Sequence, residues 1–152
     1  MSPFRGDCIF QGGSNHMEVI IRHLGNVKFE ATTRGHRVIS DQPAGNGGND
    51  TGMTPPELLL SSLGTCAGFY AAEYMKVRGL HHGDLRVTVT AEKAKAPARL
   101  AQFHIDVEIP GLDPQYQEGV LRAVKACLIH NTLLHGPAIE TTISTPVEAL
   151  AG

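Results

Sequence analysis

Residues 53–66 have the sequence MTPPELLLSSLGTC, and this stretch gives the strongest fold signal in the chain. Thr54 can cap a helix, a proline follows at the first helical position, and Glu57 stands three residues after the cap, which completes a capping box. We expect the helix to run to about Arg78. Between residues 58 and 72 it carries no charged side chain, and a helix that is apolar nearly all round is buried on most sides. Sheet, a partner subunit, or both should therefore cover it.

Antiparallel strands are predicted on both sides of this helix. Three segments before the helix and two after it lie between turn signals and have strand character, at residues 17–24, 27–33, 38–40, 84–95 and 100–109. Apolar and polar residues alternate in residues 27–33, 84–95 and 100–109. A polar, glycine-rich segment, residues 41–53, should form a flexible loop that leads into the helix.

A second helix and a last strand are predicted in the C-terminal part of the chain. The helix should start after Asp113, which can cap it, and end near Gly136, before a strand over residues 138–147. Helices placed between antiparallel strands indicate the α+β class. We expect residues 1–16 to form a loose leader and residues 17–152 to form a single domain.

Composition and charge narrow the classes of function. The chain has 152 residues, of which 41% are apolar, so it can form one globular domain with a proper core. A net charge of −2 and the absence of a basic run argue against nucleic-acid binding. No apolar stretch approaches the roughly 18 residues that span a membrane, and the N-terminus lacks the pattern of a secretory signal. Three cysteines in such a chain do not make a disulfide scaffold, so we expect a cytoplasmic protein.

Two cysteines lie on the two predicted helices. Cys66 is in the middle of the uncharged helix, and Cys127 is on the apolar stripe of the second helix. If these helices pack on each other, both thiols lie at or near one seam. They can be small core side chains, or they can be a facing pair that cycles between dithiol and disulfide. The spacing is not Cys-x-x-Cys, so it leaves both interpretations open.

Other chemistry for these cysteines has less support. Cys127 and His130 have the spacing of half a metal site, but no second half is present at ligand spacing, so we expect no metal. A Cys66–His130 hydrolase would need an oxyanion hole, and nothing in the sequence supplies one. Cys8, in the leader, is interpreted as incidental.

Two runs of the sequence resemble the OsmC/Ohr family, the osmotically inducible and organic-hydroperoxide-resistance proteins. The first is the helix start at residues 53–66, and the second is CLIHNTL at residues 127–133. The likeness covers roughly residues 17–148 and is closer to the OsmC-like branches. It implies antiparallel sheets around two buried central helices, in an intertwined homodimer.

The resemblance also implies a thiol-dependent peroxidase that reduces organic hydroperoxides. Cys66 would attack the O–O bond and become a sulfenic acid, and Cys127 would resolve it as an intramolecular disulfide. An external dithiol, which is dihydrolipoamide for some family members, would reduce the disulfide, and no metal, flavin or other cofactor is needed. The alternative is an OsmC-like stress-related or ligand-binding module with little peroxidase turnover.

The family implies a cation beside the reactive thiol, because a buried thiol has a raised pKa and reacts poorly. There, an arginine from the N-terminal strands stabilises the thiolate and is held by the glutamate that opens the first helix. By position Arg34 is the first candidate, followed by Arg37 and Arg22, and the glutamate is Glu57. Nine residues of helix, or about 900°, place Glu57 opposite Cys66 and some 13 Å away, so we expect no direct contact between them within the helix.

Overall fold

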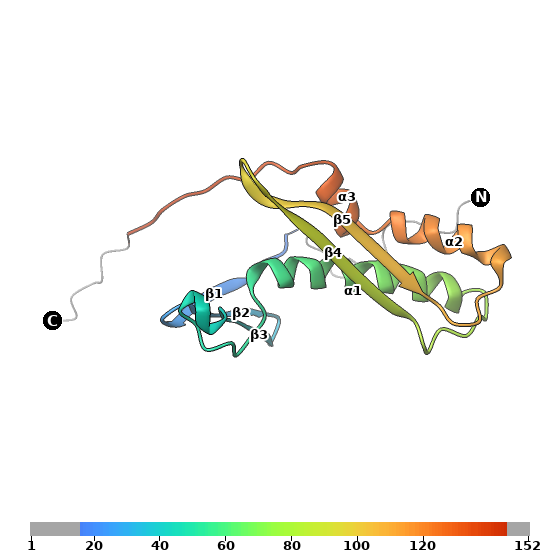
Figure 1. Cartoon of the computed structure of the whole chain (residues 1–152), viewed down its shortest axis with the longest axis horizontal. Coiled ribbons are helices and arrows are strands. Elements are labelled where there is room, and N and C mark those ends of the chain that lie inside the picture. The colour runs from blue at the N-terminus through green and yellow to red at the C-terminus, as the bar shows by residue number, and fades with distance from the viewer. Residues whose placement is uncertain (1–15, 146–152) are drawn as a thin grey trace.

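The computed structural model describes residues 16–145 and has mixed helices and antiparallel strands, which confirms the α+β class (Figure 1). In chain order the elements are β1 (Ile20–Gly25), β2 (Lys28–Thr33), β3 (His36–Ser40), the short 3-10 helix η1 (Ala44–Asn46), α1 (Pro55–Lys76), β4 (Arg86–Lys95), β5 (Ala98–Glu108), α2 (Pro114–Lys125) and α3 (Leu128–Leu134). The strands form two antiparallel sheets, β1–β2–β3 and β4–β5. None of the described helices is both long and apolar enough to cross a membrane.

The predicted leader falls almost entirely outside the described residues. Cys8 lies there too, so its interpretation as incidental stays a prediction, as does the start of the domain at residue 17.

The start of helix α1 follows from its cap. The backbone N–H and the side-chain hydroxyl of Thr54 both donate to Oε2 of Glu57, at 2.7 and 2.8 Å. A proline occupies the first turn, where a missing N–H costs nothing. The capping box predicted from the sequence is therefore confirmed, and the helix ends at Lys76, close to the predicted end.

The core lies between α1, α2 and the long β4–β5 hairpin, which crosses one side of α1 in Figure 1. Helix α1 supplies most of the buried side chains, and α2 and the start of α3 supply the rest: Leu63, Ala67, Tyr70, Ala71, Tyr74, Met75, Val120, Ala123, Val124 and Cys127. All of these side chains except Leu63 belong to one buried cluster, which fixes α1 against α2.

Two glycines allow these elements to approach closely. A Cβ atom at Gly64 of α1 would lie only 3.0 Å from Cγ2 of Val89 on β4. A Cβ atom at Gly119 of α2 would collide with the phenol of Tyr74 on α1. The helix–strand and helix–helix distances in the core therefore depend on the absence of a side chain at both positions.

The three-stranded N-terminal sheet lies apart from this core. Helix α1 packs against β4, β5, α2 and α3, while β1 is exposed along its whole length. Exposed apolar side chains of this sheet are Ile20, Ile21, Leu24, Phe29 and Val38. Leu59 and Phe69 on α1 are also exposed. A single described chain therefore covers α1 less completely than its sequence predicts.

The loop from the N-terminal sheet to α1 is built around one carboxylate. Asp41 is only 1% exposed, and its oxygens accept hydrogen bonds from backbone N–H groups of Gln42, Asn49 and Thr51 at 2.9 to 3.2 Å. The Thr51 hydroxyl donates at 2.7 Å, and the Lys28 ammonium lies 3.8 Å away. Hydrogen bonding, mainly from Thr51, lowers the pKa of Asp41 from 3.8 to about 2. Hydrogen bonds to the Asp41 carboxylate therefore hold the glycine-rich loop in place.

The prediction of one continuous second helix is wrong. It is divided into α2 and α3, because Cys127 adopts an extended backbone (φ −55°, ψ 132°) and becomes the N-cap of α3. The apolar stripe of Val120, Val124 and Cys127 keeps helical spacing across the break, so periodicity did not indicate it.

The predicted last strand is also wrong over its described part, residues 138–145. This segment belongs to neither sheet and runs away from the body of the molecule in Figure 1. Ile139 and Ile143 are 85% and 92% exposed. An extended segment becomes a strand only where another strand accepts its backbone hydrogen bonds, and no described strand of this chain does so.

Candidate dithiol site

Two free thiols meet where α1 packs against the start of α3. Cys66, in the middle of α1, is partly exposed, whereas Cys127 has no exposed surface. Cys66 packs against the buried cluster that contains Cys127. The break between α2 and α3 makes this arrangement possible, since it places Cys127 at a helix start facing α1 instead of inside a continuous helix.

The two thiols differ in their electrostatic environment. Burial raises the pKa of Cys127 from 9.0 to about 11, and the adjacent Cys66 side chain adds to the rise. The backbone N–H groups of His130 and Ile129 act in the opposite direction but do not cancel it. At neutral pH the buried Cys127 is therefore a protonated thiol, and its neighbour is the one that solvent can reach.

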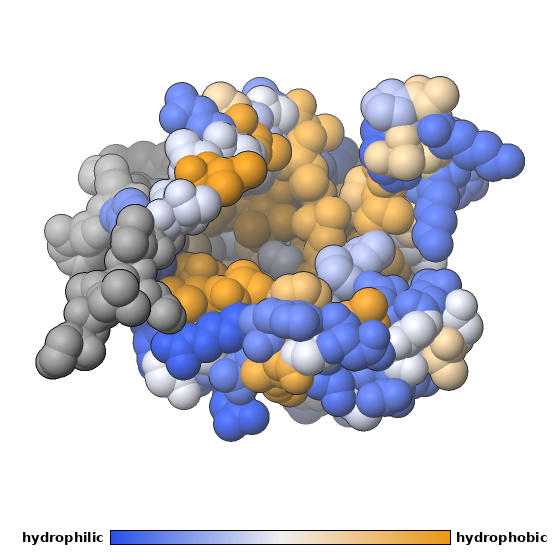
Figure 2. Space-filling model, turned by 90° about the vertical axis from the view of Figure 1, so that its left-hand side faces the viewer, coloured by the Kyte–Doolittle hydropathy of each residue, from blue (hydrophilic) through white to orange (hydrophobic). Residues whose placement is uncertain are grey.

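An apolar groove of about 660 Å³ lies beside this site, between α1, β5, α2 and α3. Its apolar lining consists of Leu59, Leu63, Leu100, Phe103, Ile105, Leu121, Val124, Leu133 and Leu134. Its polar side chains are Arg99, His104, Lys125 and His130. Figure 2, which views the molecule from the side of the N-terminal sheet, shows a hollow with an apolar interior and polar residues around it. A groove of this kind favours small apolar ligands over small polar ligands.

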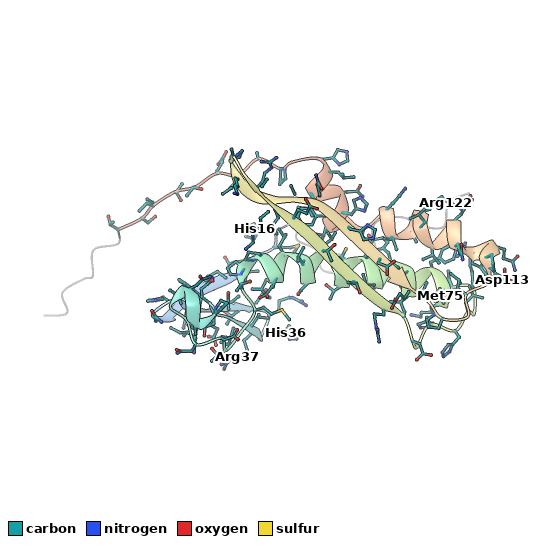
Figure 3. All side chains as sticks on the ribbon, in the orientation of Figure 1. His16, His36, Arg37, Met75, Asp113 and Arg122 are labelled. Carbon is teal, nitrogen blue, oxygen red and sulfur yellow. The ribbon has the colours of Figure 1, made fainter. Side chains whose placement is uncertain are left out.

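The three candidate arginines lie in the N-terminal sheet. Arg34 is exposed at the turn between β2 and β3, with φ of 46°, and Arg22 is exposed on β1. Arg37 pairs with Glu30 at 3.1 Å and lies at the lower margin of the molecule in Figure 3. Within residues 16–145, no hydrogen bond or ion pair joins any of them to either thiol.

Glu57 is held in the cap of α1. Hydrogen bonds from the backbone and side chain of Thr54 lower the pKa of this carboxyl. Glu57 and Cys66 lie on the same helix, and Glu57 is engaged by Thr54. Its assignment as the group that holds an arginine stays a prediction.

His130 is a residue of the site that sequence reasoning treated only as a metal ligand or hydrolase base. It lines the groove, and its Nδ1 atom is buried without a hydrogen-bond partner in the described chain. Among residues 16–145, no three or more His, Cys, Asp and Glu side chains gather in a way that could hold a metal ion. The signal available in the sequence was the Cys-x-x-His spacing, but its meaning depends on the helix break, which the sequence did not indicate.

The geometry defines an α+β protein with a dithiol pair, in which a partly exposed thiol on a long helix faces a buried thiol at the start of a short one. The chain belongs to the OsmC-like protein family, whose model matches residues 47–142, more than half of the chain. The family resemblance stated from the two cysteine-containing runs is thereby confirmed.

Solved structures share the fold. A putative osmotic stress induced and detoxification response protein from Psychrobacter arcticus has a TM-score of 0.70 at 21% identity, over 82% of this chain and 90% of that one. An OsmC-like protein from Mycoplasma pneumoniae has a TM-score of 0.68 at 19% identity, over 80% and 89%. An organic hydroperoxide resistance protein from Elizabethkingia anophelis has a TM-score of 0.61 at 17% identity, over 80% and 91%. No curated protein matches the sequence.

Proposed function

We propose that this protein is a thiol-dependent peroxidase that reduces organic hydroperoxides through a Cys66–Cys127 dithiol/disulfide cycle. The observation that carries the proposal is the pairing of a partly exposed thiol with a buried, protonated one. Membership of the OsmC-like family and the names of its structural neighbours, which include organic hydroperoxide resistance proteins, support it.

The reaction has two chemical steps. In the first, the Cys66 thiolate attacks one peroxide oxygen, the O–O bond breaks, and the second oxygen leaves as an alcohol after it takes up a proton. In the second, the Cys127 sulfur attacks the sulfenic sulfur of Cys66, and the sulfenic oxygen leaves as water. An external dithiol, such as a dihydrolipoyl group, then returns both cysteines to thiols by exchange in a reducing cytosol and is itself oxidised to a disulfide.

The groove gives a reason for selectivity. Burying about 100 Å² of an apolar peroxide substituent against its aliphatic and aromatic lining contributes about 2.5 kcal/mol, and hydrogen peroxide has no such surface. We therefore propose apolar organic hydroperoxides as the preferred substrates.

We also propose that the active form is a homodimer. Three parts of the described chain are left exposed: the apolar outer side of the N-terminal sheet, the apolar side chains on α1, and segment 138–145, which pairs with no strand. A second chain could bury all three. In such a dimer, Arg34 of the partner subunit is the first candidate for the cation beside Cys66, since the main contacts of α1 within its own chain are with β4, β5, α2 and α3.

A thiol count tests the proposed function. Reduced protein is mixed with one equivalent of cumene hydroperoxide or of hydrogen peroxide, quenched over seconds to minutes, and its free thiols are titrated and mapped by peptide mass. We expect rapid loss of two thiols, mapped to Cys66 and Cys127, faster with cumene hydroperoxide and abolished by Cys66→Ser. In Cys127→Ser we expect a sulfenic acid at Cys66 and no intramolecular disulfide. Survival of both thiols through minutes of excess peroxide would refute the peroxidase and favour a binding module on this fold.

A further inference from the structure

His130 stands in a defined position relative to the buried thiol. Cys127 is the N-cap of α3, so His130 is the third residue of that helix. In α1 the residue in the same position, Glu57, reaches back to its N-cap residue Thr54, with 2.8 Å between Oε2 and the hydroxyl oxygen. His130 holds the corresponding position relative to Cys127 at the start of α3. The effect of the His130 backbone N–H on Cys127 also shows that the residue lies against that sulfur.

The imidazole of His130 has an unused nitrogen. Its Nδ1 atom is buried and has no hydrogen-bond partner within residues 16–145. A buried ring nitrogen without a partner is destabilising, and such exceptions in a folded protein need a reason. The ring also lines the apolar groove beside the dithiol site, where water competes poorly for the nitrogen.

We propose that His130 accepts the proton of Cys127 as the disulfide forms and passes it to the oxygen that leaves Cys66. This inference rests on the proposed function and concerns its second step. The Cys127 sulfur forms the S–S bond and is oxidised, the S–O bond of the Cys66 sulfenic acid breaks, and that sulfur is reduced. The proton taken from Cys127 joins the departing hydroxide as water, so no further reactant is needed.

The buried thiol needs such a proton acceptor. With a pKa of about 11, about one Cys127 side chain in ten thousand is a thiolate at pH 7. A neutral imidazole can take up a proton near neutral pH and lowers the barrier of proton transfer in many enzymes.

The charged side chains that line the groove around the ring are cationic. Among the described residues, the titratable groups that line this groove or belong to the thiol cluster are Cys66, Tyr70 and Tyr74 from α1, Arg99 and His104 from β5, Tyr116 and Lys125 from α2, and Cys127. No carboxylate is among them in the described part of the chain.

A single-turnover experiment separates the two steps. Wild-type protein and His130→Gln are oxidised with one equivalent of cumene hydroperoxide, and intact mass follows Cys66 sulfenic acid, trapped with dimedone, and the disulfide. We expect a disulfide step about 100-fold slower, a much smaller change in the oxidation of Cys66, accumulation of the trapped adduct, and partial rescue by added imidazole. The pH dependence of the disulfide step should steepen in the variant, because hydroxide must replace the imidazole. His130→Asn serves as the second variant if His130→Gln loses its fold by circular dichroism.

The control variant is His135→Gln. His135 caps the other end of α3, is exposed, and its Nδ1 pairs with the backbone oxygen of Asn131 at 2.9 Å, so we expect no change in either step. Equal disulfide rates in wild type and His130→Gln, or a slower step that imidazole does not restore, would overturn the inference.

Diamide makes the test independent of peroxide chemistry. Cys66 adds to diamide, and Cys127 then displaces the hydrazine to form the same disulfide. If peroxide leaves Cys66 unoxidised, the proposed function fails, and the diamide reaction still decides the role of His130. A slower second step in His130→Gln supports it, and an equal step refutes it.

Discussion

The buried thiol of Cys127 makes the stability of the protein depend on pH in the alkaline range. Its pKa is 9.0 in an ordinary environment and about 11 in the fold, so folding favours the protonated thiol. The resulting stability is fully present below pH 9 and is lost as the pH rises through 9 to 11. The two-unit difference corresponds to about 2.7 kcal/mol in full, of which about 1.4 kcal/mol is lost at pH 10.

Urea unfolding at pH 7, 9 and 10 in the presence of a reductant measures this loss. Lysines and tyrosines also titrate near pH 10, so the informative quantity is the difference between wild type and Cys127→Ala. We expect Cys127→Ala to be less stable at pH 7, because it leaves a small cavity, and its deficit to shrink by about 1.4 kcal/mol at pH 10. The matched control is Cys66→Ala, which keeps the burial of Cys127 and should retain most of the pH dependence. A deficit for Cys127→Ala that is the same at all three pH values would refute the reasoning.

Three further substitutions test other parts of the structure. Asp41→Asn should lower the melting temperature by about 5 °C. It should also reduce the loss of stability expected of wild type between pH 4 and pH 2, because the pKa of Asp41 falls from 3.8 to about 2 on folding. Thermal melts along a pH series measure both effects. Gly119→Ala should destabilise the protein by about 1–3 kcal/mol in urea, since its Cβ would collide with Tyr74, whereas Gly45→Ala has open space and should change little; equal effects would contradict the close packing. Phe103→Ala should slow thiol oxidation by cumene hydroperoxide about 10-fold and leave hydrogen peroxide unaffected, and an equal loss with both peroxides would argue against a substrate role for the groove.

Local signals in the sequence predicted the first helix and the strands well. The start of α1 depends on Thr54, a proline and Glu57, which are within four residues of each other, so the sequence contains all that the cap needs. Strands β4 and β5 follow an alternating pattern whose pairing is local to one hairpin. Contacts between neighbours in the chain are the ones that a single sequence can reveal.

The wrong predictions depend on contacts that are not local. The break at Cys127 is an irregular backbone conformation inside an unbroken apolar stripe, and periodicity carries no information about it. Residues 138–145 have the composition of a strand, but a strand also needs a free sheet edge nearby. The buried nitrogen of His130 depends on packing between α3 and its neighbours, so no pattern in the sequence could have shown it. Which of the three arginines serves the site stays a prediction, because no hydrogen bond or ion pair in the described chain joins any of them to a thiol.

The break before α3 also determines what a bond between the two thiols would do to the whole chain. Such a bond would close a ring of about sixty residues that contains the rest of α1, the β4–β5 hairpin and α2. Closing a ring of this length lowers the conformational entropy of the unfolded chain, and in the absence of strain this stabilises the folded state by about 4 kcal/mol. Oxidation would then raise both the melting temperature of the protein and its resistance to proteases. The disulfide form, which cannot react with peroxide, would therefore persist longer in the cell than the reduced, reactive form.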